Sequence, residues 1–276
     1  MFAAINSFLT RALTNLTDVY WPFVSMLLHG DSPQQFNQDT STNVFPITAV
    51  GAVQASTRTP FTGGPSSYGS GYFNGSSYLT VPSNAALNLP SGAFTIEMWI
   101  YRSGAGAGAG IYENLVATSS GASAVWGVYV NSSTLAIGFY NSSGLVQTST
   151  AITNSTWTHI AVSRTSGNNL QIFINGVSGY SASNTGTGTI VSTLGIAFDA
   201  NNNSYYGYIS NLRYVNGTTL YTGNFTPPTT QLTAVTNTAL LTLQTNVPQN
   251  NNQFFDTSTN NFTITRNGNT TQGSFN

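Results

Sequence analysis

Hydrophobic and polar residues alternate along most of this chain with a period of two, the pattern of β-strands that have a buried face. The clearest example is residues 94–101, FTIEMWIY. Its Phe, first Ile, Met and second Ile fall on one face, and its Thr, Glu, Trp and Tyr fall on the other. Both faces carry large groups, so this segment is expected to be a central strand covered on both sides, as in a sandwich of two sheets.

Residues 70–82, SGYFNGSSYLTVP, predict a β-hairpin just before that strand. Asn74 and Gly75 both tolerate positive φ and so favour a type I′ turn. Pro82 ends the second strand because it cannot donate to a ladder.

Short strands continue to about residue 215, separated by turns rich in Asn, Ser and Gly. Three of them predict a meander, and two more predict a hairpin whose second strand ends at a tight turn of Asn175 and Gly176. The meander strands are residues 125–130, 134–140 and 144–148, and the hairpin strands are 157–164 and 170–175. The pattern therefore predicts an all-β fold.

The first 17 residues are the exception, because their apolar side chains recur at three- and four-residue steps, which predicts a helix. These side chains are Phe2, Ile5, Leu9, Leu13 and Leu16. A signal peptide is the competing interpretation, but no cation precedes the apolar part and polar residues interrupt it. So short a helix is marginal alone in water, and residues 1–18 are expected to be an arm. Three roles for the arm stay open: it packs on its own sandwich, it forms a trimer with other copies, or it docks into a larger particle.

Two stretches at the two ends of the chain repeat one another. DTSTNVFPIT begins at Asp39 and DTSTNNFTIT begins at Asp256, and a Leu-Leu pair precedes each. We expect both aspartates to accept hydrogen bonds from the backbone two residues on, as in an Asx turn. The unit at 239–276 thus repeats the pattern of 27–51 and belongs to one expected sandwich domain, 19–276. We expect it to supply a sheet edge or an interface, either beside the N-terminal copy or on a neighbouring subunit.

Four blocks in a fixed order resemble the laminin-G-like, concanavalin A-like jelly-roll family. They are GYFNGSSYLTVP with FTIEMWIY, WTHIAVSR with LQIFING, the Leu-Gly pair at 194–195, and GYISNLRY, and the match covers residues 68–228. The resemblance implies a concanavalin A-like jelly-roll sandwich of two antiparallel sheets, to which the N-terminal helical arm is added. It leaves function open, because this fold hosts lectins, glycosidases, adhesion modules and virion proteins.

The composition is poor in charge: 5% of residues are charged, with no Lys and no Cys, and the net charge is −1. Nothing basic enough to bind nucleic acid or an anionic membrane is present, and no apolar run reaches the length of a membrane span.

The C-terminal repeat resembles segments of virion proteins of tailed phages, especially marine and cyanobacterial ones. We therefore expect a non-enzymatic virion surface protein, either a capsid decoration or a tail-fibre component, assembled in the host cytoplasm. It would be a homotrimer that contacts other virion proteins through its arm and host glycans through its loops. The alternative is a carbohydrate-binding adhesin module of a bacterial surface protein, and a divergent glycosidase ranks third.

Glycoside hydrolysis needs two neighbouring carboxylates. The resemblance implies that a glucanase would place them on one strand face, but Glu97 is followed on its face by Trp99 and Tyr101. No hydrolysis is therefore expected. A lone carboxylate on a covered strand needs a cation, so Glu97 is expected to form a structural ion pair with Arg213, or else with Arg164.

Histidines at 29 and 159 lack a second ligand at zinc spacing. Asp199 and Asp39 are weak candidates for calcium ligands. One carboxylate per loop makes a poor calcium site, so no cofactor is expected. The candidate glycan-binding residues are aromatic side chains near polar turns. The alternative interpretation is that these aromatic side chains pack in the core or in an interface. They are Trp126, Tyr140, Tyr205, Tyr206 and Tyr221.

Overall fold

The structure is a computed structural model that describes seven stretches of the chain. These are residues 58–62, 69–106, 110–119, 125–197, 205–243, 256–267 and 271–272, all within the unit Val50–Asn276. The predicted helical arm at 1–18 and the N-terminal copy of the repeat at 27–51 lie outside the described residues.

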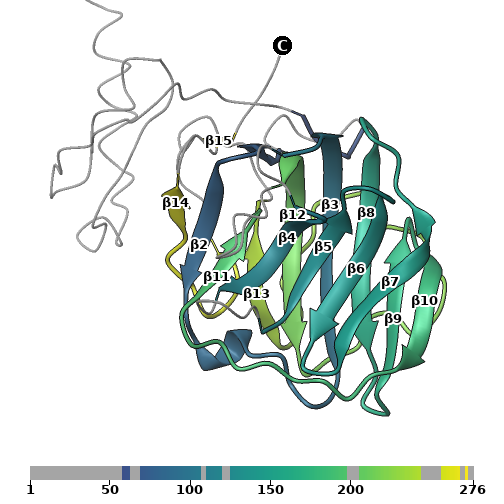
Figure 1. Cartoon of the computed structure of the whole chain (residues 1–276). Coiled ribbons are helices and arrows are strands. Elements are labelled where there is room, and N and C mark those ends of the chain that lie inside the picture. The colour runs from purple at the N-terminus through teal and green to yellow at the C-terminus, as the bar shows by residue number, and fades with distance from the viewer. Residues whose placement is uncertain are drawn as a thin grey trace, which may run out of the picture. The chain divides into compact units, whose positions relative to one another are not determined.

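Two antiparallel sheets pack face to face as a jelly-roll-like sandwich (Figure 1). The 8-stranded sheet runs in the order β10 (Val177–Ser183), β9 (Asn169–Ile174), β8 (Trp157–Arg164), β3 (Phe94–Gly104), β12 (Tyr206–Asn216), β1 (Gly71–Asn74) and β15 (Thr271–Gln272), with β13 (Thr238–Thr242) also on β12. The 7-stranded sheet runs in the order β14 (Thr265–Asn267), β2 (Tyr78–Pro82), β11 (Thr193–Ile196), β4 (Tyr112–Ser119), β5 (Gly127–Asn131), β6 (Ala136–Asn141) and β7 (Gly144–Ala151). A 3-10 turn, η2 (Ala85–Leu87), follows β2.

The strand predicted to be central is β3, which lies between β8 and β12. Its Phe, Ile, Met and Ile side chains enter the core between the sheets, where Phe94 packs on Phe139 of the other sheet. Its opposite face is covered too, but by a chain segment and not by a sheet. The hydroxyl of Thr95 accepts a hydrogen bond from the backbone N–H of Leu220, 2.9 Å away. Residues 218–229 therefore form a strap over this outer face.

The predicted hairpin of β1 and β2 is wrong, because the two strands belong to different sheets. Gly75 does adopt positive φ, +81°, and the side chain of Asn74 accepts a hydrogen bond from the backbone of Ser76. The turn carries the chain from one sheet to the other, so that Phe73 and Leu79 enter the same core from opposite sides. Burying both apolar side chains outweighs the local hydrogen bonds that a hairpin would form.

The other predicted pairings are confirmed. Strands β8 and β9 form a hairpin, and β5, β6 and β7 form the meander. Asn175 and Gly176 join β9 to β10 with φ of 50° and 77°, as a type I′ turn requires.

The C-terminal unit contributes to both sheets. Strand β13 pairs with β12, while β14 and β15 are the outermost strands of the two sheets on one side of the sandwich (Figure 1). Asp256 fixes a turn that precedes β14, as the sequence predicts, since its Oδ1 accepts from the backbone N–H of Ser258 at 2.9 Å. The same carboxylate accepts from the backbone of Leu241 and of Phe262. The C-terminal repeat therefore supplies sheet edges.

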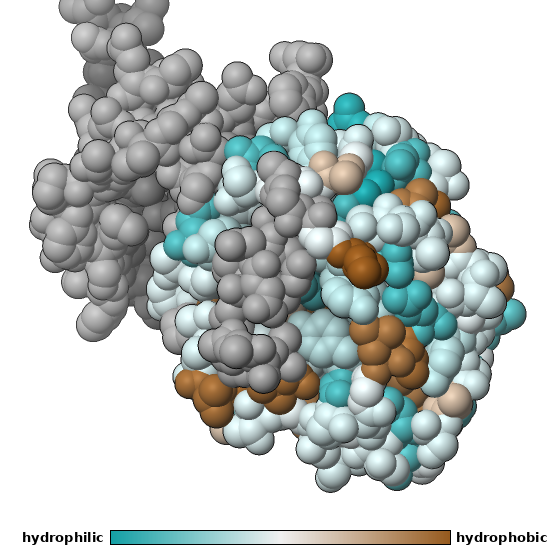
Figure 2. Space-filling view, in the orientation of Figure 1, coloured by the Kyte–Doolittle hydropathy of each residue, from teal (hydrophilic) through white to brown (hydrophobic). Residues whose placement is uncertain are grey.

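The charged side chains that the structure describes are mostly used inside. Arg102 of β3 reaches across to Glu113 of β4, 2.5 Å away, and ties the two sheets together. Figure 2 accordingly shows a face of weakly polar character, with a few separate apolar patches. In the described part of the chain, no helix is both long enough and apolar enough to span a membrane.

Candidate functional site: an aromatic row and its pocket

Four aromatic side chains stand in one row across the outer face of the 8-stranded sheet. Tyr72 of β1 lies opposite Tyr208 of β12, Tyr208 lies opposite Tyr101 of β3, and Tyr101 lies opposite Trp157 of β8. The ring centroids are 5.0, 5.8 and 5.7 Å apart in that order. Phe73, Ile209 and Ile100, which adjoin the three tyrosines in their strands, enter the core, so the alternation of each strand points the tyrosine rings outward. Trp157 lies opposite Tyr101 in the register and so stands on the same face.

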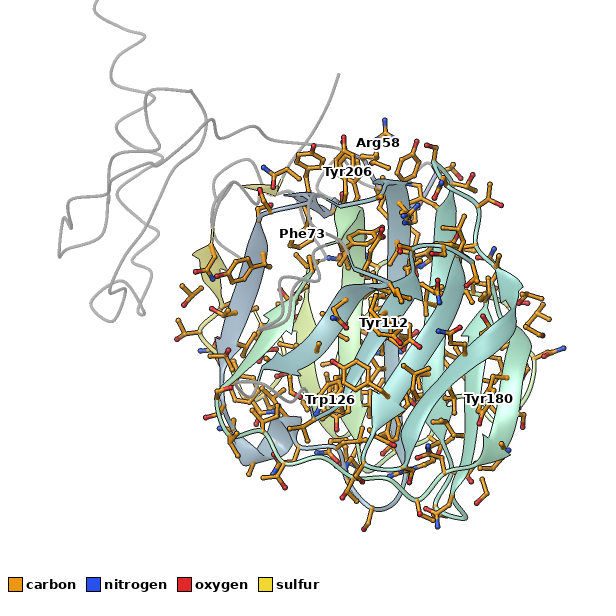
Figure 3. The ribbon with its side chains drawn as sticks, in the orientation of Figure 1. Arg58, Phe73, Tyr112, Trp126, Tyr180 and Tyr206 are labelled. Atoms are coloured by element: carbon orange, nitrogen blue, oxygen red, sulfur yellow. The ribbon has the colours of Figure 1, made fainter. Side chains whose placement is uncertain are left out.

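A glycine makes room for this row. Gly207 has φ of +147°, and a Cβ at that position would lie 2.1 Å from the carbonyl oxygen of Tyr101. An irregularity of the ladder between Tyr206 and Gly207 lets both Tyr206 and Tyr208 approach Tyr72, whose ring centroid is 6.3 Å from that of Tyr206. Figure 3 shows Tyr206 at the upper end of the sandwich, on the same end as Arg58.

The side chain of Arg58 lies on the middle of the row. Its guanidinium carbon is 4.5 Å from the ring centroid of Tyr101 and 5.1 Å from that of Tyr208, within range for cation–π attraction. Arg58 is exposed and covers Tyr208, which is only 7% exposed, while Tyr72 and Trp157 at the two ends are half-buried.

Two tyrosines of the row, Tyr72 and Tyr208, stay neutral at ordinary pH. Burial, and then the hydrogen bond with Tyr206, raise the pKa of Tyr72 to about 12. Burial also raises the pKa of Tyr208, against the opposing effect of the Arg58 charge. The rings therefore act as apolar plates with polar hydroxyl ends.

A pocket of about 560 Å³ adjoins the row at Trp157, a size typical of sites for small ligands. Its aromatic walls are Phe61, Trp99 and Trp157, and Phe61 meets Trp99 edge to face at 6.1 Å. Pro227 and Pro228 of the strap close one side, and the side chains of Asn175 and of threonines supply polar groups. All of the residues that line the pocket are uncharged.

The strap is held down by the network around Glu97. Oε1 of Glu97 accepts from Arg213, with Nη2 at 2.5 Å and Nε at 2.9 Å, and Oε2 accepts from the hydroxyl of Tyr221 at 2.8 Å. His159 Nε2 is 3.3 Å from Oε2, and the ring of Tyr221 stacks on Phe225 of the same strap. The structure thus brings together the ion pair expected from the sequence, and this pair anchors one wall of the pocket.

The electrostatics of this network favour the ionised carboxylate. Burial alone would raise the pKa of Glu97, but the hydrogen bond from His159 and the charge of Arg213 outweigh it, so the pKa is lowered. Burial, followed by the negative charge of Glu97, raises the pKa of the Tyr221 hydroxyl.

Arg164, the other cation considered for Glu97, is buried elsewhere. It donates to the backbone carbonyl oxygens of Gly92 at 2.9 Å and Gly186 at 2.5 Å, and also to that of Pro90. Phe94 lies beneath its guanidinium. Arg164 therefore fastens two loops at the far end of the sandwich from the row.

The sequence model of the Concanavalin A-like lectin/glucanases superfamily matches residues 73–220, more than half of the chain. The chain belongs to this superfamily. No curated protein matches the sequence at a significant level.

Among solved structures, this concanavalin A-like sandwich is similar to a Bacteroides ovatus protein described as a candidate carbohydrate binding protein. The TM-score is 0.56 at 13% identity, with 76% of this chain and 61% of that one covered, so the chain spans about three fifths of that protein. It is also similar to domain 4 of a Geobacillus stearothermophilus arabinanase solved with arabinotriose (TM-score 0.41, 17% identity, 74% and 95% covered). At these identities the likeness concerns the fold alone.

Of the five aromatic residues expected to bind glycan, two are corrected by the structure. Trp126 and Tyr205 are fully buried in the core of the sandwich, and Trp126 packs on Tyr214 there. Polar turns flank both residues in the sequence, but the side chains themselves point inward, so neither reaches a ligand on the surface.

The other three do not share one site. Tyr221 holds the strap onto Glu97, and Tyr140 lies over Gly127 on the 7-stranded sheet. Only Tyr206 stands at the aromatic row, beside Tyr72. Figure 3 shows Tyr206 at the upper end of the sandwich, whereas the buried Trp126 lies toward the lower end.

The calcium candidates Asp199 and Asp39 lie outside the described residues. Within the described residues, no three His, Cys, Asp or Glu side chains come together as a metal site would require. The three carboxylates that the structure describes are all buried. Glu97 is held by Arg213, Glu113 by Arg102, and Asp256 by backbone amides.

Sequence reasoning missed most of the site: Arg58, Phe61, Tyr72, Tyr101, Trp157 and Tyr208. One signal was available, because the alternation of residues 94–101 puts Trp99 and Tyr101 on the face opposite the core. What brings the other rings beside them is the register between strands far apart in the chain, which alternation within one strand does not contain.

Proposed function

We propose that this concanavalin A-like module binds carbohydrate, without cutting it, on the outer face of its 8-stranded sheet. The observation that carries the proposal is the aromatic row of Tyr72, Tyr208, Tyr101 and Trp157, aligned by strand register and running into the pocket beside Trp99. Half-buried rings offer flat apolar faces to the C–H faces of sugar rings, and the hydroxyl and amide groups around them suit sugar hydroxyls.

The rigidity of the platform supports the same proposal. Three of the four rings stand on strands β12, β3 and β8 in the middle of a sheet, so a ligand that binds there does not have to order a loop. Binding that needs little ordering loses little conformational entropy. The Bacteroides ovatus protein of the same fold is consistent with a role in carbohydrate binding.

The non-enzymatic part of the proposal is supported by the carboxylates. Glycosidases hold two carboxyl groups on either side of the scissile bond. Glu97 and Glu113 are both fully buried and both paired with arginine. We therefore expect no release of reducing sugar from any glycan that the chain binds. Hydrolysis that disappears in Glu97→Gln would contradict this part of the proposal.

The test of the site is a glycan array followed by calorimetric titration of each glycan that binds. Trp157→Ala removes the ring shared by the row and the pocket, and we expect it to weaken binding about tenfold or more. The matched control is Tyr140→Ala, which removes an aromatic ring from the 7-stranded sheet. If Tyr140→Ala abolishes binding and Trp157→Ala does not, the site is on the other sheet.

A finer role, display on the surface of a tailed-phage virion, is proposed from the resemblance of the C-terminal repeat to virion segments. In this role the chain is a homotrimer, a capsid decoration or appendage component, and residues 1–18 hold it to other virion proteins. The charge-poor composition supports the proposal, as does the placement of β14 and β15 at the sheet edges. Light scattering with and without residues 1–17 tests it. A monomer that still binds glycan favours the alternative, an adhesin module of a bacterial surface protein.

A further inference from the structure

We infer that the pocket beside Trp157 receives an N-acetylated amino sugar, whose acetyl methyl group enters the apolar interior and whose acetyl oxygen accepts a hydrogen bond from Asn175. The inference rests on the proposed function, because it assigns the class of sugar to the same site. It follows from the division of polar and apolar groups within the pocket, from the fixed side chain of Asn175, and from the uncharged lining.

The pocket has an apolar interior and a polar rim. Its ring side chains, which are Phe61, Trp99, Trp157 and three prolines, are buried or half-buried, whereas Asn175 and three threonines are exposed. A sugar that carries only hydroxyl groups would bring some of them against these rings without hydrogen-bond partners, which costs free energy. A methyl group gains free energy in the same place, because its apolar surface leaves water.

The side chain of Asn175 offers a donor in a fixed direction. The backbone N–H of His159 lies 2.9 Å from Oδ1 of Asn175. A backbone N–H only donates, so the amide oxygen must be the acceptor and Nδ2 is left for another partner. Among the described residues, Nδ2 has no hydrogen-bond partner. Because an amide nitrogen donates and does not accept, it suits a ligand group such as an acetyl carbonyl oxygen.

The turn that carries Asn175 is fastened to the strap that forms the opposite part of the pocket. The backbone N–H of Phe225 donates to the carbonyl oxygen of Gly176 at 2.9 Å. A Cβ at Gly176 would lie 1.9 Å from the carbonyl oxygen of Phe225, so only glycine allows this approach. The strap continues from there into Pro227 and Pro228. The donor and the apolar wall are therefore positioned before a ligand arrives, which lowers the entropy lost on binding.

The uncharged lining favours an acetylated amine over a free one. The residues around the pocket carry no charge, so a protonated amine would enter an apolar interior without a counter-ion, at a high cost in free energy. Acetylation removes this charge and places an apolar methyl group and a carbonyl acceptor on the same substituent. Both match groups that the pocket presents.

The experiment compares three tetrasaccharides that share one backbone and differ only at the second carbon of each ring. Chitotetraose carries an acetylated amine there, its deacetylated form carries a free amine, and cellotetraose carries a hydroxyl group. Calorimetric titration of the full chain is done in mild acid, where the free amine is protonated. We expect chitotetraose to bind about tenfold tighter than either partner, from one buried methyl group and one hydrogen bond. A second arm compares N-acetylgalactosamine with galactosamine and galactose by saturation-transfer NMR.

The variant Asn175→Asp isolates the donor. It keeps an acceptor oxygen for the backbone N–H of His159, and an Asp-Gly pair still favours the turn, but it replaces Nδ2 with an oxygen. We expect the preference for the acetylated sugar to fall about fivefold, and the free amine to bind more tightly than before, because a carboxylate pairs with it.

The matched control is Asn224→Asp, the same change on the strap. Oδ1 of Asn224 accepts from the backbone N–H of Ser178 at 3.0 Å, and Asn224 does not line the pocket. This variant should leave the order of the three sugars unchanged. Both variants keep their acceptor oxygen, so their melting temperatures should stay close to that of the wild type, and this measurement separates lost recognition from lost folding.

A preference for the acetylated sugar in either arm, reduced in Asn175→Asp, supports the inference and identifies the configuration of the sugar. Equal binding within both arms, or a preference that Asn175→Asp leaves unchanged, overturns it. Either of these last results leaves the proposed carbohydrate binding in place, provided that Trp157→Ala still weakens binding of a glycan found on the array. If no glycan binds on the array or in the titrations, the proposed function fails and this inference fails with it.

Discussion

Arg213 and Glu97 face each other across β12 and β3, with Nη2 and Nε of the arginine 2.5 and 2.9 Å from a single carboxylate oxygen. The side chain of Arg213 is 8% exposed and that of Glu97 is 0% exposed. This pair lies under the strap that closes the pocket, so the stability of the sandwich and the shape of the candidate site depend on the same contact.

Removing one partner should therefore be costly, because it leaves the other charge buried. We expect Glu97→Gln to lower the free energy of unfolding by about 3 kcal/mol, the lower end of the range for a broken buried pair. Urea denaturation measures this loss. Arg213→Gln should cost a similar amount, and the double variant should cost clearly less than the two single losses combined. Strict additivity would mean that the two charges do not stabilise one another.

The lowered pKa of Glu97 predicts how stability changes in acid. Because the folded-state pKa lies below the ordinary value of 4.5, the unfolded state binds the proton more readily than the folded state does. The stabilisation is therefore present above that value and is lost as the pH falls through the folded-state pKa. One such group contributes a slope of up to about 1.4 kcal/mol per pH unit. Urea unfolding of wild type and Glu97→Gln across this range should give curves that converge in acid, and parallel curves would contradict the assignment.

Asp256 makes a third prediction, because a single buried carboxylate orders the whole C-terminal turn. It accepts from the backbone amides of Leu241, Ser258 and Phe262 at 2.9 to 3.0 Å. Asp256→Ala leaves these donors unpaired at a cost of about 1–3 kcal/mol for each donor that stays buried. We expect a loss of about 3 kcal/mol in urea unfolding. Asp256→Asn, which keeps one acceptor oxygen, should lose less, and equal losses would argue against hydrogen bonding as the cause.

Two glycines provide a matched pair for the packing of the 7-stranded sheet. A Cβ at Gly138 would lie 2.0 Å from a ring atom of Tyr129, whereas one at Gly223 would meet nothing within 4 Å. Gly138→Ala must push the buried ring of Tyr129 away from its hydrogen bond with Gln147. We expect it to lower the melting temperature by an amount equivalent to about 1–3 kcal/mol. Gly223→Ala should change stability by no more than about 0.5 kcal/mol, and similar losses in the two variants would rule out the steric cause.

The parts of the fold that local signals determine were predictable from the sequence. The turn of Asn175 and Gly176 and the alternation on either side of it depend on residues close together in the chain, and they gave the right hairpin. The turn of Asn74 and Gly75 carries a similar signal, but the hairpin that it predicted does not form, because β1 and β2 belong to different sheets. The deciding factor there is which sheet receives the following strand, and this depends on core packing against residues more than a hundred positions away.

The candidate site shows the same division. Trp99 and Tyr101 were placed on the correct face of β3 by alternation alone. Tyr72, Tyr208 and Trp157 join them only through the register of four strands, and the positive φ of Gly207 adjusts that register. Burial is equally non-local: Trp126 and Tyr206 both lie next to polar turns in the sequence, yet one fills the core and the other stands at the surface.

The edge strands that the C-terminal unit supplies have a consequence for how this protein acquires its structure. The hydroxyl of Thr80 in β2 donates to the carbonyl oxygen of Thr265 in β14, a residue 185 positions later. Strand β1 likewise pairs with β15 from the end of the chain. Contacts between such distant residues close a long loop and form slowly. Until the last strands arrive, the nascent chain presents two unpaired backbone edges, where a neighbouring chain can add itself. We therefore expect refolding yield to fall as protein concentration rises.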